Sequence, residues 1–310
     1  MREYEISIIR LISTASIVIC HIQQHYNISL CWWFNVGVQI FFFMSGFLLG
    51  GGTEKNSKWL FKRIRRIFTD YFIYIVIIIC LYSLFTPETF TFDIIANLLC
   101  GKSTIYGAEQ LWFVRPLFLC YLHVFLIDYF VGKIVQSNYL IKIIGSAIIL
   151  FILFFFSIEV DGHWLICFIC GYLIRKLFDT RVCHIIIAII TGMFTIGFSY
   201  LRIVDQGNNS YYVWWHVFAG VFFFMFLYVV LKKKKLKLSE NKKKFLNFTD
   251  KYTYDIYINH WLFISSYFSV LELTKYRVAN FMMFLILTLL SAYFLFCISE
   301  FVNKKLEFYF

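Results

Sequence analysis

Charged residues are scarce in this sequence. Asp, Glu, Lys and Arg make up 15% of the 310 residues and apolar types make up 61%, whereas soluble domains contain about 25% charged residues. From Leu11 to Thr53 the chain contains none of the four charged types, which is enough for two membrane crossings of about 20 residues each. This scarcity excludes a soluble globular domain. We therefore predict an all-α integral membrane protein.

Proline is also rare, and the cysteines show no pairing pattern. Only Pro87 and Pro116 occur, which weighs against transporters built from Pro-broken helices in inverted repeats. Cys167 and Cys170 form a CxxC motif inside an apolar run, where packing explains them better than redox or zinc chemistry. The sequence also lacks a metal-ligand spacing, a phosphate loop and a serine nucleophile elbow. We expect no metal cofactor and no disulfide framework.

Uncharged runs bounded by charges or turn residues predict about ten membrane crossings in one domain over residues 1–310. The predicted crossings are 6–25, 33–50, 68–86, 111–131, 141–158, 163–178, 184–203, 211–231, 252–270 and 278–300.

Basic residues gather on one side of these crossings. If crossings alternate in direction, about 23 of the 29 Lys and Arg residues fall on the side of both termini, and Lys102, Arg202, Lys275 and Arg277 fall on the other. Because cytoplasmic loops retain Lys and Arg, we predict that both termini are cytoplasmic in a multi-pass cell-membrane protein. The formal net charge of +11 is then a topology signal that implies the lipid bilayer, and not nucleic acid, as partner.

The first predicted crossing carries two ionisable side chains, Arg10 and His21. Eleven residues are three helical turns plus about 20°, so the two side chains share one face, about 16 Å apart along the axis. Taken singly, Arg10 could be a snorkelling side chain and His21 an interfacial histidine. Because an arginine within a membrane span marks a functional site by default, their common face favours a passage in which His21 is a general base and Arg10 binds a phosphate or polarises a carbonyl.

Five stretches resemble, in order, the motifs of membrane acyltransferase family 3. They are Arg10-x10-His21, Phe41-Phe42-Phe43-Met44-Ser45-Gly46-Phe47-Leu48-Leu49, Phe61-Lys62-Arg63-Ile64-Arg65-Arg66-Ile67, Leu111-Trp112-Phe113 and Tyr254-Asp255-Ile256-Tyr257-Ile258-Asn259-His260. Two positions depart from the family pattern. Phe68-Thr69-Asp70 follows where the family commonly has a proline, and Asp255 stands where a small residue is commoner.

The resemblance implies transfer of an acyl group, usually acetyl, from cytoplasmic acyl-coenzyme A to a hydroxyl of a sugar or another envelope molecule. Acyl-coenzyme A carries phosphates, and a dense cationic cluster at a cytoplasmic mouth suits them. The residues predicted to bind this donor are Lys62, Arg63, Arg65, Arg66, Ser45 and Gly46. Small residues such as Ser45 and Gly46 also serve helix packing in membranes.

Four further residues are candidates for the substrate passage. Trp112 and Arg115 are predicted near the outer boundary, although an interfacial aromatic belt is the alternative for Trp112. Tyr257 and His260, one turn apart near mid-membrane, would steer the acyl arm or donate to an oxyanion, or else be buried structural residues. The carboxylates that could orient His21 are Glu109, Glu159 and Asp161.

We therefore predict a membrane-bound O-acyltransferase in which Arg10 positions the donor and His21 is the base. The acceptor would be a surface or envelope polysaccharide, or its lipid-linked glycolipid precursor. Direct transfer and an acyl-histidine relay are both open. The alternative from another class is a transporter or flippase for a lipid-linked sugar, in which the intramembrane Arg10 and His21 serve substrate or proton movement.

Overall fold

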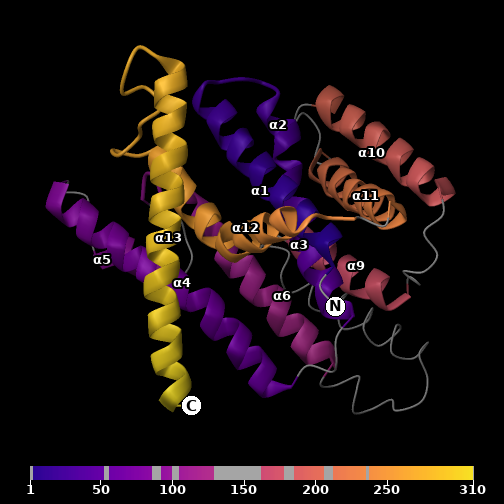
Figure 1. Cartoon of the computed structure of the whole chain (residues 1–310), viewed down its shortest axis with the longest axis horizontal. Helices are drawn as coiled ribbons and strands as arrows, with labels where there is room; N and C mark the ends of the chain where they lie inside the picture. The colour runs from indigo at the N-terminus through magenta and orange to yellow at the C-terminus, as the bar shows by residue number, and fades with distance from the viewer. Residues whose placement is uncertain are drawn as a thin grey trace. The chain divides into compact units, whose positions relative to one another are not determined.

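The computed structural model describes residues 3–51, 56–85, 92–99, 105–128, 162–177, 185–205, 212–234 and 237–309. Within these ranges the chain is helical and contains no β-strand (Figure 1), which confirms the all-α prediction. The chain divides into two compact units. The first unit contains Met1–Ser57 and Leu119–Asp250, and the second contains Lys58–Phe118 and Lys251–Phe310. A single domain over residues 1–310 stays a prediction.

The helices in chain order are α1 (Tyr4–His25), α2 (Cys31–Phe34), α3 (Val36–Gly50), α4 (Ser57–Phe85), α5 (Phe92–Leu99), α6 (Val114–Leu126), α9 (Gly162–Leu177), α10 (Ile185–Asp205), α11 (Tyr212–Lys233), α12 (Glu240–Asn259) and α13 (Arg277–Tyr309). Within the described ranges, two 3₁₀ turns adjoin these helices: η2 (Glu109–Phe113) precedes α6 and η4 (His260–Phe263) follows α12.

Among the described residues, six helical stretches are long and apolar enough to cross a membrane. They are Tyr4–His25, Cys31–Gly50, Ser57–Phe85, Ile185–Asp205, Val213–Lys233 and Arg277–Glu307. These stretches support a multi-pass membrane protein, while ten crossings and cytoplasmic termini stay predictions. The predicted crossing 141–158 lies outside the described residues.

The prediction of a continuous crossing over 252–270 is wrong. Helix α12 is a polar helix that begins at Glu240 and ends at Asn259, and after η4 the chain turns until α13 begins at Arg277. Serine hydroxyls take part in this turn, where they offer the backbone hydrogen-bond partners outside a helix. Ser266 donates to the carbonyl of Leu262 and accepts from the N–H of Phe268, and the apolar residues of this segment conceal that signal.

In the first unit, α3 packs closely against α9 through glycines (Figure 1). A Cβ on Gly46 would overlap the backbone carbonyl of Phe168, and one on Gly50 would overlap that of Tyr172. From the other side, a Cβ on Gly171 would overlap the carbonyl of Phe43. Small residues four apart allow membrane helix backbones to approach in this way. The α3–α9 contact is therefore backbone to backbone.

Gly46→Ala should destabilise the first unit. The added methyl group meets the backbone of α9, which cannot rotate away as a side chain could, so the expected loss of unfolding free energy is about 1–3 kcal/mol. The measurement is heat stability of the detergent-solubilised protein. Gly197→Ala in α10 is the matched control, because a Cβ there meets nothing within 4 Å, and alanine raises helix stability by about 0.5–1 kcal/mol. Equal stability of the two variants would contradict this packing.

Two further helices of the first unit pack against α3, and a third packs on one of these. Helices α1 and α11 pack against α3, and α10 packs along α11. The hydroxyl of Ser13 in α1 donates to the carbonyl of Gly37 at 2.5 Å, so α1 and α3 also approach closely. Phe43, Phe47 and Phe224 are fully buried and their rings pack against one another. Helix α1, which carries the predicted catalytic residues, packs against both α3 and α11 of this core.

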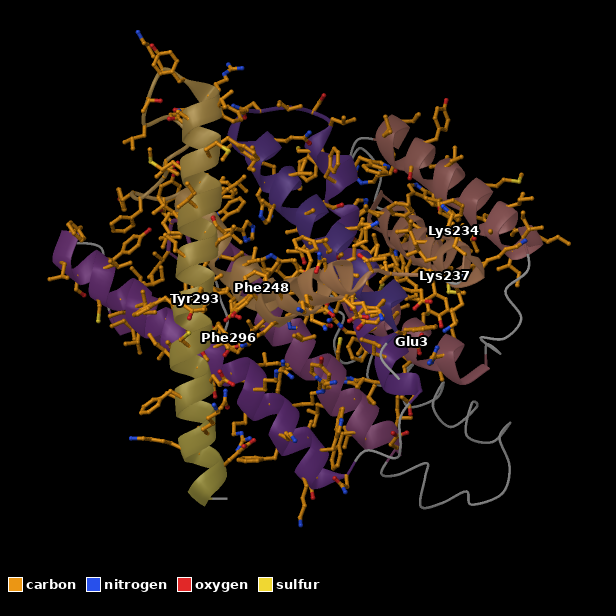
Figure 2. All side chains as sticks on the ribbon, in the orientation of Figure 1. Glu3, Lys234, Lys237, Phe248, Tyr293 and Phe296 are labelled. Atoms are coloured by element: carbon orange, nitrogen blue, oxygen red, sulfur yellow. The ribbon has the colours of Figure 1, made fainter. Side chains whose placement is uncertain are left out.

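In the second unit, buried polar groups hold η2 against other segments. The side-chain amide of Gln110 donates to the carbonyl of Ile258 at 2.5 Å, and the hydroxyl of Tyr257 donates to the carbonyl of Gln110 at 3.3 Å. Helix α13 packs beside η4. The ammonium of Lys251 lies 4.1 Å from the ring centre of Phe296, and Figure 2 labels Phe296 on α13. The Gln110 and Tyr257 bonds thus hold η2 beside the end of α12.

Candidate functional site

Arg10 is held by a carboxylate that sequence reasoning missed. Its Nη1 lies 2.8 Å from Oδ1 of Asp250 on α12. The hydroxyl of Ser7, one turn before Arg10 on α1, donates to Oδ2 of Asp250 at 2.5 Å. The Asp250 side chain is only 6% exposed and that of Arg10 is 24% exposed. Both carboxylate oxygens are thus occupied by α1.

His21 lies on the same helix as Arg10. Helix α1 is continuous from Tyr4 to His25, so the predicted common face follows from its geometry, with the two residues about 16 Å apart along the axis. His21 is half-buried. A single small group cannot contact both side chains at this separation, but a long, thin ligand could.

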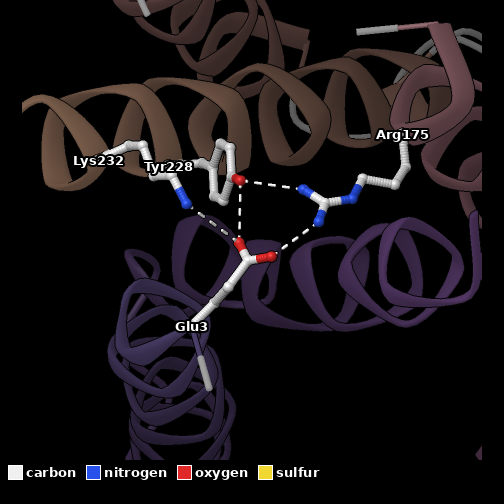
Figure 3. Close-up of polar contacts among 4 residues, drawn as sticks. All are labelled: Glu3, Arg175, Tyr228 and Lys232. Carbon is white, nitrogen blue, oxygen red and sulfur yellow. Dashed lines mark hydrogen bonds and ion pairs between the residues drawn. The ribbon is translucent and has the colours of Figure 1, made fainter. Parts of the chain in front are cut away.

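The start of α1 is anchored by a second charged network (Figure 3). Arg175 Nη2 donates to Oε1 of Glu3 at 2.7 Å, and Tyr228 donates to Oε2 at 3.0 Å. The ammonium of Lys232 lies 3.6 Å from Oε2. Burial alone would raise the pKa of the Glu3 carboxyl, but the Arg175 guanidinium and the hydrogen bonds outweigh burial and hold that pKa below its ordinary value. The network joins α1 to α9 and α11.

Ser45 and Gly46 were predicted to approach the donor. Ser45 is half-buried. The space against Gly46 is occupied by the backbone of α9, which leaves no room for a ligand at that α-carbon. The role that the structure gives Gly46 is helix packing.

The basic cluster lies on α4 in the second unit. The helix begins at Ser57, eleven residues before the predicted crossing, because Lys and Arg are good helix formers and nothing in the cluster breaks the helix. Lys62 and Arg66 are exposed, while Arg63 and Arg65 are half-buried. Arg65 Nη2 lies 2.5 Å from Oε1 of Glu307 on α13. Arg65 is thus engaged in an ion pair.

The four passage candidates also lie in the second unit. Trp112 in η2 is half-buried and Arg115 in α6 is exposed. The hydroxyl of Tyr257 is used by the Gln110 carbonyl, and Nδ1 of the fully buried His260 lies 2.7 Å from the Tyr257 carbonyl. These contacts favour the structural alternative for Tyr257 and His260 over donation to an oxyanion.

Of the carboxylates considered as partners of His21, only Glu109 lies in the described part of the chain. Its Oε2 accepts the indole N–H of Trp261 and, at 2.8 Å, the backbone N–H of Gly107. Glu109 therefore has its own contacts within the second unit. Glu159 and Asp161 lie outside the described residues. Within the described residues, no cluster of three His, Cys, Asp or Glu side chains is able to hold a metal ion.

The predicted site residues thus fall in two groups. Arg10, His21, Ser45 and Gly46 belong to the first unit, and the α4 cluster and the four passage candidates belong to the second. The residues missed are Asp250 and Ser7. One signal could have found Asp250: an arginine inside an apolar helix requires a partner, and Asp250 is a lone acid between basic residues at 242–244 and 251.

Comparisons with known proteins identify the family to which this chain belongs. Neither the curated proteins nor the solved structures include a match to this chain. The family model described as an acyltransferase domain matches residues 3–300, and so includes both the α1 pair and the α4 cluster. With nearly its whole length matched, the chain belongs to acyltransferase family 3.

Proposed function

We propose that this protein transfers an acyl group, most simply acetyl, from cytoplasmic acyl-coenzyme A to a hydroxyl of a surface polysaccharide or its lipid-linked precursor. The observation that carries the proposal is the pair of Arg10 and His21 on α1, in which the guanidinium of Arg10 is held by the buried carboxylate of Asp250 on α12. Family membership supports acyl transfer as the reaction class. The acyl group, the donor and the acceptor are our assignments.

In this reaction His21 is the proton carrier. Its neutral imidazole removes the proton from the acceptor hydroxyl as the oxygen attacks the thioester carbonyl carbon. A carbon–oxygen bond forms and the carbon–sulfur bond breaks. The imidazolium then returns the proton to the departing thiolate, so the products are an ester and free coenzyme A. No other reactant is consumed.

Arg10 holds the donor away from the reacting carbon. Since about 16 Å of helix separates Arg10 from His21, the guanidinium cannot also contact a carbonyl placed at His21. It is suited to an oxygen of the long thioester arm or to a phosphate, because it is always charged and presents several donors. We assign the exposed Lys62 and Arg66, together with Arg63, to further phosphates of the donor.

The acceptor side follows from the proposed topology. With a cytoplasmic N-terminus in the cell membrane, α1 begins inside and His21 lies toward the outer end of the helix, where an envelope hydroxyl would approach. Trp112 and Arg115 are the acceptor-side residues we propose in the second unit. Trp112 would stack on a sugar ring, and Arg115 would bind its oxygens.

Labelled acetyl transfer tests this function. Inverted membrane vesicles from cells expressing the protein receive acetyl-labelled coenzyme A, and the glycan fraction is examined for alkali-labile label by mass spectrometry. Labelled succinyl-coenzyme A is run in parallel. We expect ester label in the glycan only with the protein present. Absence of label from both donors, with movement of a lipid-linked sugar that needs no acyl-coenzyme A, would instead identify a flippase.

A further inference from the structure

Asp250 carries a buried carboxylate. Its two partners described above both lie on one face of α1. Ser7 and Arg10 are three residues apart, which places them one above the other on a helix. Oδ1 of Asp250 faces the guanidinium of Arg10 at 2.8 Å and Oδ2 faces the hydroxyl of Ser7 at 2.5 Å. The carboxylate thus bridges two successive turns of α1 from α12.

Burial separates this pair from an ordinary surface ion pair. The Asp250 side chain is 6% exposed, and a carboxylate removed from water is tolerated when it is paired and its remaining oxygen is hydrogen-bonded. Ser7 is itself buried and supplies that second bond. With two anchoring points, the carboxylate has one orientation, and so does the guanidinium nitrogen that it holds.

The same geometry leaves part of the Arg10 side chain exposed. A guanidinium has five N–H donors, and within the described ranges Asp250 Oδ1 is the acceptor of the hydrogen bond that Arg10 donates. The side chain of Arg10 remains 24% exposed. The remaining donors form a fixed planar array, of the kind that matches oxygen pairs on a phosphate or a carbonyl.

We infer that Asp250, supported by Ser7, is a positioning residue that orients Arg10 toward the acyl donor. The inference rests on the proposed function, because it assigns a use to the donors that Asp250 leaves open. The competing account is that Asp250 only neutralises an arginine in an apolar helix. That account needs the charge of Asp250 but places no demand on where the guanidinium lies.

The Michaelis constant for acetyl-coenzyme A separates the two accounts, because the amount of folded enzyme alters the maximal rate and leaves KM unchanged. Vesicles containing wild type, Asp250→Asn, Asp250→Glu or Ser7→Ala are assayed for acetyl transfer over a range of acetyl-coenzyme A concentrations. Glu3→Gln and Ser13→Ala are matched controls. Each removes a carboxylate or a hydroxyl that bonds a different partner of the first unit.

We expect Asp250→Asn to raise KM and to lower kcat/KM by about 10- to 100-fold, the scale of a misplacement of about 1 Å. Asp250→Glu should restore part of this loss and Ser7→Ala should cause a smaller one, with wild-type KM in both controls. The double variant Arg10→Asp with Asp250→Arg, called the exchanged pair, keeps the ion pair with its charges swapped between the two helices. It should recover the heat stability that either single substitution loses. It should not recover transfer, because the guanidinium then lies on α12.

Two results would overturn the inference alone: wild-type KM in Asp250→Asn while Arg10→Ala is inactive, or recovery of transfer by the exchanged pair. Failure of the wild type to transfer from either acyl-coenzyme A would overturn the proposed function, and the inference with it. Binding of coenzyme A alone, measured as thermal stabilisation of the purified protein, gives a readout independent of the acceptor. Asp250→Asn should weaken this binding, and Glu3→Gln should not.

Discussion

His21→Ala is expected to lower acyl transfer by about 100- to 10,000-fold, the usual contribution of a positioned general base. Alanine cannot accept the proton of the acceptor hydroxyl, and the other histidine of α1, His25, lies one turn nearer the end of the helix. Initial rates of labelled acetyl transfer, normalised to the folded protein in the vesicles, measure the effect. KM for acetyl-coenzyme A should change little, since Arg10 still holds the donor.

His25→Ala is the matched control for this prediction. His25 is half-buried, as is His21, so its removal tests the cost of losing an imidazole from this part of the helix. Transfer should persist in His25→Ala. Transfer at the wild-type rate in His21→Ala would remove His21 from the mechanism.

Arg10→Ala should act on both activity and stability. The donor loses its guanidinium contact, and Asp250 becomes a buried charge without its cation, which destabilises a protein by roughly 3–5 kcal/mol. We expect transfer to be lost and the melting temperature in detergent to fall. Rates per folded protein and thermal unfolding of the same preparation separate the two effects.

A second substitution distinguishes the two losses. Adding Asp250→Asn to Arg10→Ala removes the unpaired charge, so heat stability should recover while transfer stays absent. Recovery of both would mean that Arg10 only serves insertion and folding. Continued instability of the double variant would contradict the ion pair as the source of the stability loss.

The fold was predictable from sequence where composition alone decides. Helix α1 follows from an apolar run with one arginine, and the helical period of 3.6 residues is sufficient to place Arg10 and His21 on one face. The segment after Phe263 was not predictable in this way. Its apolar residues suit a membrane helix, and the hydrogen bonds that Ser266 makes in the turns after η4 leave no mark in that apolar pattern.

The site was predictable only in part, because its partners are far apart in the chain. Arg10 and Asp250 are separated by 240 residues and Arg65 and Glu307 by 242, and no local pattern reports such pairings. Gly46 illustrates a different limit. A small residue permits close approach by a ligand or by a helix, and only the position of Phe168 shows that a helix is what approaches.

The unbroken course of α4 has a mechanical consequence. Its 29 residues extend about 44 Å at 1.5 Å per residue, whereas the hydrocarbon core of a bilayer is about 30 Å thick. The cations near its start are therefore carried by a continuous helix and not by a flexible loop. One extra residue inserted between Arg66 and Tyr71 would rotate all of these cations together by about 100° about the axis of α4, relative to the rest of the helix.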